Sequence, residues 1–138
     1  MRRIVRFAIV TCICIQILGE VALAQDIGPP NGSLVVVGGG MRSSEIVDRF
    51  VQLAGGPHAH IVVIPTAGGA ESYDQSFGGL RPFHQAGVRN LTLLHTYDRE
   101  EAETDAFVHA IQKASGVWFT GGRQWRLADS YLGTRTEE

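Results

Sequence analysis

Four short runs of apolar, largely β-branched residues constrain the fold of this chain more than any other feature. The runs lack the regular apolar–polar alternation of strands that face water on one side. Continuous apolar strands are typical of parallel sheets that are covered by helices on both faces. We therefore predict four buried parallel strands, at residues 33–37, 60–64, 91–94 and 117–119.

The segments between these runs carry apolar residues at helical spacing. They predict helices at residues 43–54 and 100–114, a weaker helix within 73–86, and a last helix at 125–132 that Gly133 would end. The resulting order, strand then helix four times over, predicts an α/β domain with a mostly parallel sheet. Ligands of such sheets bind beyond the carboxyl ends of the strands.

The N-terminus has the three-part layout of a secretory signal peptide. Arg2, Arg3 and Arg6 precede an apolar stretch at residues 7–18, and small residues permit cleavage after Ala24. The stretch of about 12 residues is shorter than the roughly 20 that a membrane-spanning helix needs. We expect an exported protein, periplasmic or extracellular, without a stable membrane anchor; an uncleaved anchor is the alternative.

Cleavage of residues 1–24 defines the expected domain organisation. A linker at residues 25–32 would lead into a domain at residues 33–138. Cys12 and Cys14 are the two cysteines of the chain, and both would leave with the signal. The mature protein would then have no disulfide and no thiol nucleophile.

Several common sites are missing from the sequence. It contains no Gly-x-Ser-x-Gly nucleophile elbow and no phosphate-binding loop that ends in Gly-Lys. The turn at residues 38–40 resembles a dinucleotide-binding loop, but the second strand ends without the acidic residue that would hold a ribose. His58 and His60 have no third ligand at metal-binding spacing. We expect no cofactor, no metal and, at a net charge of −2, no nucleic-acid partner.

The other three histidines are scattered along the sequence. We interpret His84, His95 and His109 as surface groups or as interior groups whose hydrogen bonds are satisfied.

The turn after the fourth predicted strand is the most informative stretch for function. Backbone N–H groups at Gly121 and Gly122 could bind an oxyanion, and the Gln124 amide could hold a substrate carbonyl. The alternative is an ordinary strand-to-helix turn with Trp125 and Leu127 in the core. The glycine turn at Gly39 and Gly40 would lie at the same edge of the sheet, and we count it as a further substrate-binding candidate.

Four blocks in order resemble the cyanophycinase branch of the serine peptidase family that also contains dipeptidase E. Together with the Leu-Gly-Thr that ends at residue 134, they span nearly all of residues 32–134. The blocks are residues 32–40 (GSLVVVGGG), 46–56 (IVDRFVQLAGG), 61–67 (IVVIPTA) and 116–127 (GVWFTGGRQWRL).

The resemblance implies a three-layer α/β/α fold similar to class I glutamine amidotransferases, with flavodoxin-like topology. It also implies a Ser nucleophile on a Gly-Thr-Ser-Ala-Gly elbow, with a His and an acid further along. Thr134 and Glu137 match a helix-opening capping box, and the family elbow follows such a helix, so we expect a C-terminally truncated domain. Gly121 or Gly122 would then donate to the oxyanion, and Gln124 would sit beside the substrate.

One residue departs from the family pattern. The family loop commonly reads Gly-Gly-Asp-Gln or Gly-Gly-Asn-Gln, whereas this chain has Arg123 at the third position. A cation there would repel the arginine side chains of cyanophycin and suit a carboxylate. The expected partner is therefore a small peptide or peptide-like substrate other than cyanophycin, and a homodimer is left open as an assembly.

Two other interpretations compete with an inactive hydrolase fragment. The main alternative is a small non-catalytic α/β module that binds a ligand in the glycine-rich cleft. A class I amidotransferase-like or DJ-1-like protein is a weaker third, because both generally use a Cys that the mature chain would lack.

Overall fold

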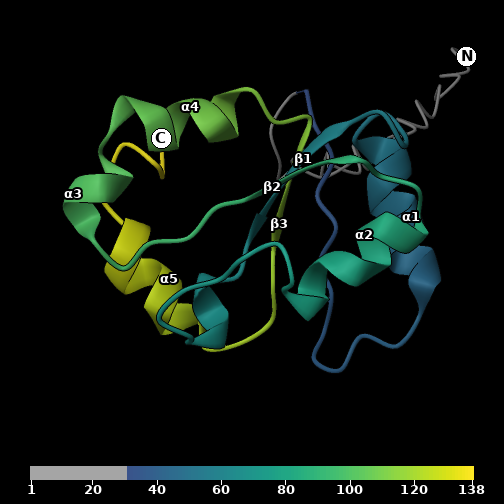
Figure 1. Cartoon of the computed structure of the whole chain (residues 1–138), viewed down its shortest axis with the longest axis horizontal. Coiled ribbons are helices and arrows are strands. Elements are labelled where there is room, and N and C mark those ends of the chain that lie inside the picture. Colours follow the sequence, from purple (N-terminus) through teal and green to yellow (C-terminus); the bar gives the residue numbers. More distant parts are fainter. Residues whose placement is uncertain (1–30) are drawn as a thin grey trace, which may run out of the picture. The chain divides into compact units, whose positions relative to one another are not determined.

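Three parallel strands form the sheet at the centre of the structure, in the order β2-β1-β3 (Figure 1). In β1, Val62 lies opposite Thr92 of one neighbour and Val117 of the other. The helices and strands, in chain order, are α1 (Ser44–Leu53), β1 (His60–Ile64), η1 (Thr66–Gly68), η2 (Gly78–Leu80), α2 (Arg81–Gln85), β2 (Asn90–Leu93), α3 (Arg99–Ala102), α4 (Asp105–Gln112), β3 (Gly116–Phe119) and α5 (Gln124–Tyr131).

This computed structural model describes residues 31–138, and the unit considered below begins at Ser33. The predicted signal peptide at residues 1–24 lies outside the described residues, as does most of the predicted linker at 25–32.

The central strand β1 is buried on both faces. Ile61 and Val63 pack in a core with side chains from α1 and α2, and Val62 and Ile64 pack in a second core with α3, α4 and α5. All four side chains are at most 1% exposed. Each such burial contributes about 1.5–3 kcal/mol to folding. The helices accordingly lie on opposite sides of the sheet in Figure 1, and the predicted three-layer α/β/α fold with a parallel sheet is confirmed.

Local capping sets where the helices begin. The Ser43 hydroxyl accepts from the Glu45 N–H at 3.2 Å and opens α1. The predicted helix at residues 100–114 is two helices in the structure, because the Thr104 hydroxyl accepts from the Phe107 N–H at 3.3 Å and starts α4. A capping threonine inside an apolar periodic stretch was the signal for this break.

Three other predictions differ from the structure. The strand expected at residues 33–37 is not formed, and Leu34 and Val36 are 75% and 83% exposed. Residues 33–37 pair with none of the three strands, and a strand forms only where its backbone finds a partner. Within residues 73–86, η2 and α2 replace the single weak helix, and the capping box at Thr134 opens a turn rather than a helix.

Among residues 31–138, no helix is both long and apolar enough to cross a membrane. The same part of the chain contains no group of three or more His, Cys, Asp or Glu side chains that could hold a metal ion.

We predict that the Phe83→Ala substitution destabilises the protein by about 3–5 kcal/mol. Phe83 is 1% exposed and meets the rings of Phe50 and Trp118 edge-on, at 6.2 and 5.5 Å between centroids. Phe119→Ala is the matched control, because that ring is 54% exposed and its loss should cost less than about 1 kcal/mol. Urea unfolding measures both, and equal costs would contradict this account of the core.

Candidate active site

The segments that follow the three strands meet at the carboxyl edge of the sheet. The Thr120 N–H donates to the Ile64 carbonyl at 3.1 Å, and the Leu94 N–H donates to the Val63 carbonyl at 2.9 Å. These bonds extend the pairing of β1 with both neighbours by one step. They bring the turn after β3 against η1, which lies beside α5 in Figure 1. This edge is where open α/β sheets bind their ligands.

Gly122 makes the closest approach between the two turns. Its φ is +152°, and a Cβ at this position would collide with the carbonyl of Ala67. The next residue, Arg123, donates its N–H to the same Ala67 oxygen at 2.9 Å. Only a residue without a side chain allows this contact, so Gly122 is required by the backbone geometry. At Gly121, in contrast, a Cβ would meet no atom within 4 Å.

The glycine pair leaves backbone donors available at the sheet edge. Gly121 and Gly122 are exposed, and among the described residues neither N–H donates a hydrogen bond. Arg123 follows the pair as the N-cap of helix α5, which begins at Gln124, and the Arg123 side chain makes no capping hydrogen bond. Unpaired N–H groups beside a helix start can stabilise negative charge.

Two arginines flank this turn with different roles. The Arg126 guanidinium donates from Nη1 to the Ala67 carbonyl at 3.0 Å and packs against Gly69 and over the Trp125 ring. The Arg123 side chain is exposed. The described residues contain one ion pair, between Arg135 and Asp105. No carboxylate of the described residues therefore pairs with Arg123. Gln124 is exposed beside it.

Gly39 and Gly40 form a separate turn, which shares no hydrogen bond with the turn after β3 among the described residues. They lie on an exposed turn ahead of α1, with Gly40 at φ +75° and no atom within 4 Å of a Cβ built at either position.

Sequence reasoning missed a buried polar cluster at the same edge. Thr66 Oγ1 lies 2.8 Å from His95 Nδ1 and 2.7 Å from the Tyr131 hydroxyl. His95 Nε2 is buried and has no partner among the described residues, so the prediction that this histidine is exposed or fully satisfied was wrong. Burial lowers the pKa of His95 and raises the pKa of Tyr131. The available signal was that Thr66 and His95 each follow a predicted strand of a parallel sheet, which puts them at one edge.

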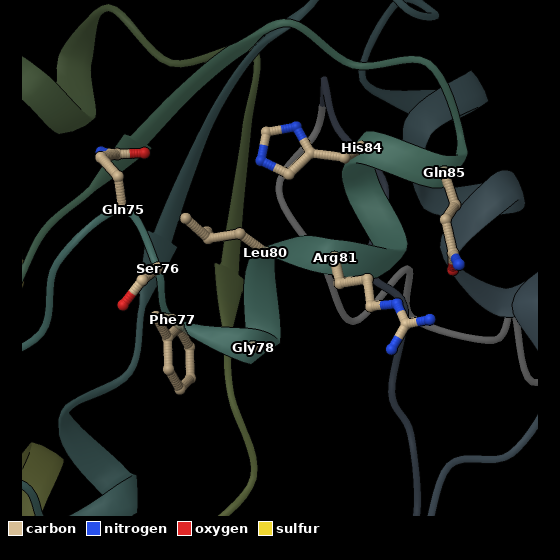
Figure 2. Close-up of a pocket in the computed structure, with 8 residues that line it drawn as sticks. All are labelled: Gln75, Ser76, Phe77, Gly78, Leu80, Arg81, His84 and Gln85. Carbon is tan, nitrogen blue, oxygen red and sulfur yellow. The ribbon is translucent and has the colours of Figure 1, made fainter.

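Surface hollows lie elsewhere on the described part of the chain, and the two described next do not include the glycine pair. One, of about 410 Å³, is lined by residues from the segment before α2 and from α2 itself; Figure 2 shows the His84 ring beside it. The other, of about 420 Å³, is mostly apolar and runs along β3 and α5 past Phe119 and Leu132.

We predict that Gly122→Ala destabilises the fold by about 1–3 kcal/mol, because its Cβ must displace the Ala67 carbonyl. Gly121→Ala is the control on the neighbouring residue and should change stability by less than about 1 kcal/mol, since nothing lies near its Cβ. Urea unfolding of both variants tests the contact. Similar stabilities for the two would show that the turns do not touch as described.

No family model matches the chain. It is, however, similar to several curated proteins named cyanophycinase. Identity is 33% over 101 residues for the protein of Geminocystis herdmanii, 31% over 100 residues for that of a Nostoc species, and 32% over 102 residues for that of Thermosynechococcus vestitus. The matches cover 69%, 69% and 70% of this chain, and 36%, 33% and 31% of the relatives.

The chain thus spans about a third of the length of the curated relatives it matches. An aligned length of 101 residues extends well beyond any single motif. These similarities support a cyanophycinase-like family for this chain.

Proposed function

We propose that these residues form the oxyanion and substrate side of an exported serine-type hydrolase of the cyanophycinase-like kind. Its reaction would be the cleavage of amide bonds in small or β-aspartyl peptides. The similarity to proteins named cyanophycinase supports the reaction class, and the fold supports the position of the site. Export rests on the layout of the N-terminal sequence alone.

The single observation that carries this proposal is the exposed glycine pair after β3. Gly121 and Gly122 present N–H groups without partners among the described residues, at the edge where ligands of α/β sheets bind. The Arg123–Ala67 hydrogen bond and the contact of Gly122 with Ala67 fix the turn from behind. Donors that are fixed in advance stabilise a transition state without reorganising during the reaction.

The chemistry of amide hydrolysis explains why such donors matter. When a serine Oγ attacks the amide carbon, the carbonyl π electrons move to oxygen and form an oxyanion. One well-placed N–H donor is worth about 3 kcal/mol to that state. The 138 residues contain no Gly-x-Ser-x-Gly elbow, so the nucleophile and its His and acid partners would have to come from sequence outside them.

Gln124 and Arg123 are the proposed substrate contacts. Both follow the glycine pair directly and both are exposed. The Gln124 amide can donate to and accept from a peptide group. The guanidinium of Arg123, without a described carboxylate partner, favours a substrate that carries a negative charge.

We predict that the purified 138-residue chain cleaves neither β-aspartyl-arginine nor acidic dipeptides above the buffer rate, because it lacks a nucleophile. Amino-acid release measured by chromatography tests this. Turnover that co-purifies with the chain and disappears in a Gly122→Ala variant would contradict it.

We also predict that the coding DNA beyond codon 138 contains a Gly-x-Ser-x-Gly elbow, in frame or after a frameshift. The absence of such an elbow would favour the non-catalytic binding module.

In a protein that carries the elbow, we predict that Arg123→Asp shifts the preference from acidic dipeptides towards β-aspartyl-arginine. An exposed charge pair is worth about 0.2–1 kcal/mol, so the ratio of kcat/KM values should change by about 1.4-fold to fivefold. Arg89→Asp is the control for the change in net charge, because Arg89 is exposed and precedes β2, at the opposite end of the sheet from the turn. A preference for the arginine peptide before any substitution would refute the role of Arg123.

A further inference from the structure

Thr66 joins two elements that are distant in sequence. Its side chain is fully buried, and its hydroxyl contacts both His95, which follows β2, and Tyr131, the last residue of α5. The Tyr97 hydroxyl donates to the Thr66 carbonyl at 3.1 Å. The main chain and the side chain of Thr66 are therefore both fixed by groups from other segments.

The hydroxyl of Thr66 has one proton, so its two neighbours cannot play the same role. In one arrangement Tyr131 donates to Thr66 and Thr66 donates to His95 Nδ1, which leaves the imidazole proton on Nε2. In the other, His95 Nδ1–H donates to Thr66, Thr66 donates to Tyr131, and Tyr131 donates to the Thr96 carbonyl at 3.3 Å. Both arrangements contain a neutral imidazole.

A charged imidazole permits only the second arrangement, because both ring nitrogens then carry protons. Its Nε2–H would also need an acceptor, and this atom is buried without a hydrogen-bond partner among the described residues. Protonation of His95 therefore restricts Thr66 to the second arrangement, and only the Ala70 and Glu71 carbonyls and the Glu101 charge offset the desolvation of the charged ring.

Ala67 connects Thr66 to the turn at Gly121 and Gly122. Ala67 directly follows Thr66, and its carbonyl accepts from both the Arg123 N–H and the Arg126 guanidinium. The place of that carbonyl determines where Arg123 and, with it, Gly122 lie. Any movement of Thr66 is transmitted to the turn after β3 by contacts that are already formed.

We propose that His95 is a positioning residue, which holds the turn at Gly121 and Gly122 in place through Thr66 and the Ala67 carbonyl. This inference rests on the proposed function, because that turn is the candidate oxyanion loop. His95 itself need not touch a substrate. Its contribution is to keep the two backbone donors at a fixed place on the sheet edge.

The surroundings of His95 determine how it responds to pH. The rings of Tyr73 and Tyr97 meet it edge-on, each at 4.8 Å between centroids, and Tyr131 faces it across Thr66. Burial lowers the pKa of His95, whereas the Ala70 and Glu71 carbonyls and the Glu101 charge act to raise it. Stability that depends on neutral His95 is thus complete above the unfolded pKa of 6.5 and is lost as pH falls through the lower pKa of the folded state.

The experiment follows backbone amide resonances of Gly122 and Arg123 and the ring resonances of His95 by NMR between pH 8 and pH 5, in the full chain without substrate. We expect both amides to titrate together with His95, at a midpoint below 6.5. His95→Asn keeps a polar group near the Nδ1 position but cannot titrate, so its loop resonances should stay near their neutral positions at every pH. His95→Phe should shift them at every pH.

His60 provides the matched control. Its Nε2 lies 2.8 Å from Thr92 Oγ1 and its Nδ1 lies 3.3 Å from the Lys113 carbonyl, so it also pairs with a threonine of a neighbouring segment. It begins β1, at the opposite end of the strand from Thr66. His60→Asn should leave the titration of Gly122 and Arg123 unchanged.

Two results would overturn the inference: loop amides that do not follow His95 in the unsubstituted chain, or a titration that persists in His95→Asn. If His95→Phe does not fold, these two measurements decide alone. The readout needs no hydrolysis, so failure of the proposed function would appear in the activity assays and not in these resonances.

Discussion

The carbonyl of Ala67 is the point on which the candidate site depends. It accepts from the Arg123 N–H and from the Arg126 guanidinium, and it excludes any side chain at Gly122. Its strong polar partners come from the turn after β3 and from the first turn of α5. Two loops that would otherwise be independent are thereby held as one surface, and the unpaired glycine donors acquire a fixed position.

That surface is possible because β1 is buried on both faces. Ile61 and Val63 are held by one helical layer, and Val62 and Ile64 by the other. Burial on both faces fixes the register of β1, and this register fixes the position of its last residues at the sheet edge. The polar groups that follow it, beginning with Thr66, can then form a network among fully buried atoms. The burial of β1 thus forms the apolar core and also fixes the position of the polar residues that follow the strand.

The spacing of apolar residues predicted correctly those helices and strands that have a clear apolar pattern of their own. The strand at residues 60–64 and the helix of α1 agree with the structure because apolar spacing and flanking glycines define both. Residues 33–37 were predicted as a strand from their apolar content, which does not reveal whether the segment pairs with the sheet. Gly122 was predicted as a site residue, but its contact with Ala67 depends on a loop 55 residues away. The contact of His95 with Thr66 was missed because no local motif indicates a hydrogen bond between residues 29 positions apart.

Amide hydrogen exchange at the turn after β3 tests the central claim most directly. The Arg123 amide is bonded to the Ala67 carbonyl, and the Gly121 and Gly122 amides are exposed and unpaired among the described residues. The account predicts that Arg123 exchanges at least about tenfold more slowly than its intrinsic rate, while both glycines exchange close to theirs. Protected glycines, or an Arg123 amide that exchanges as fast as they do, would contradict it.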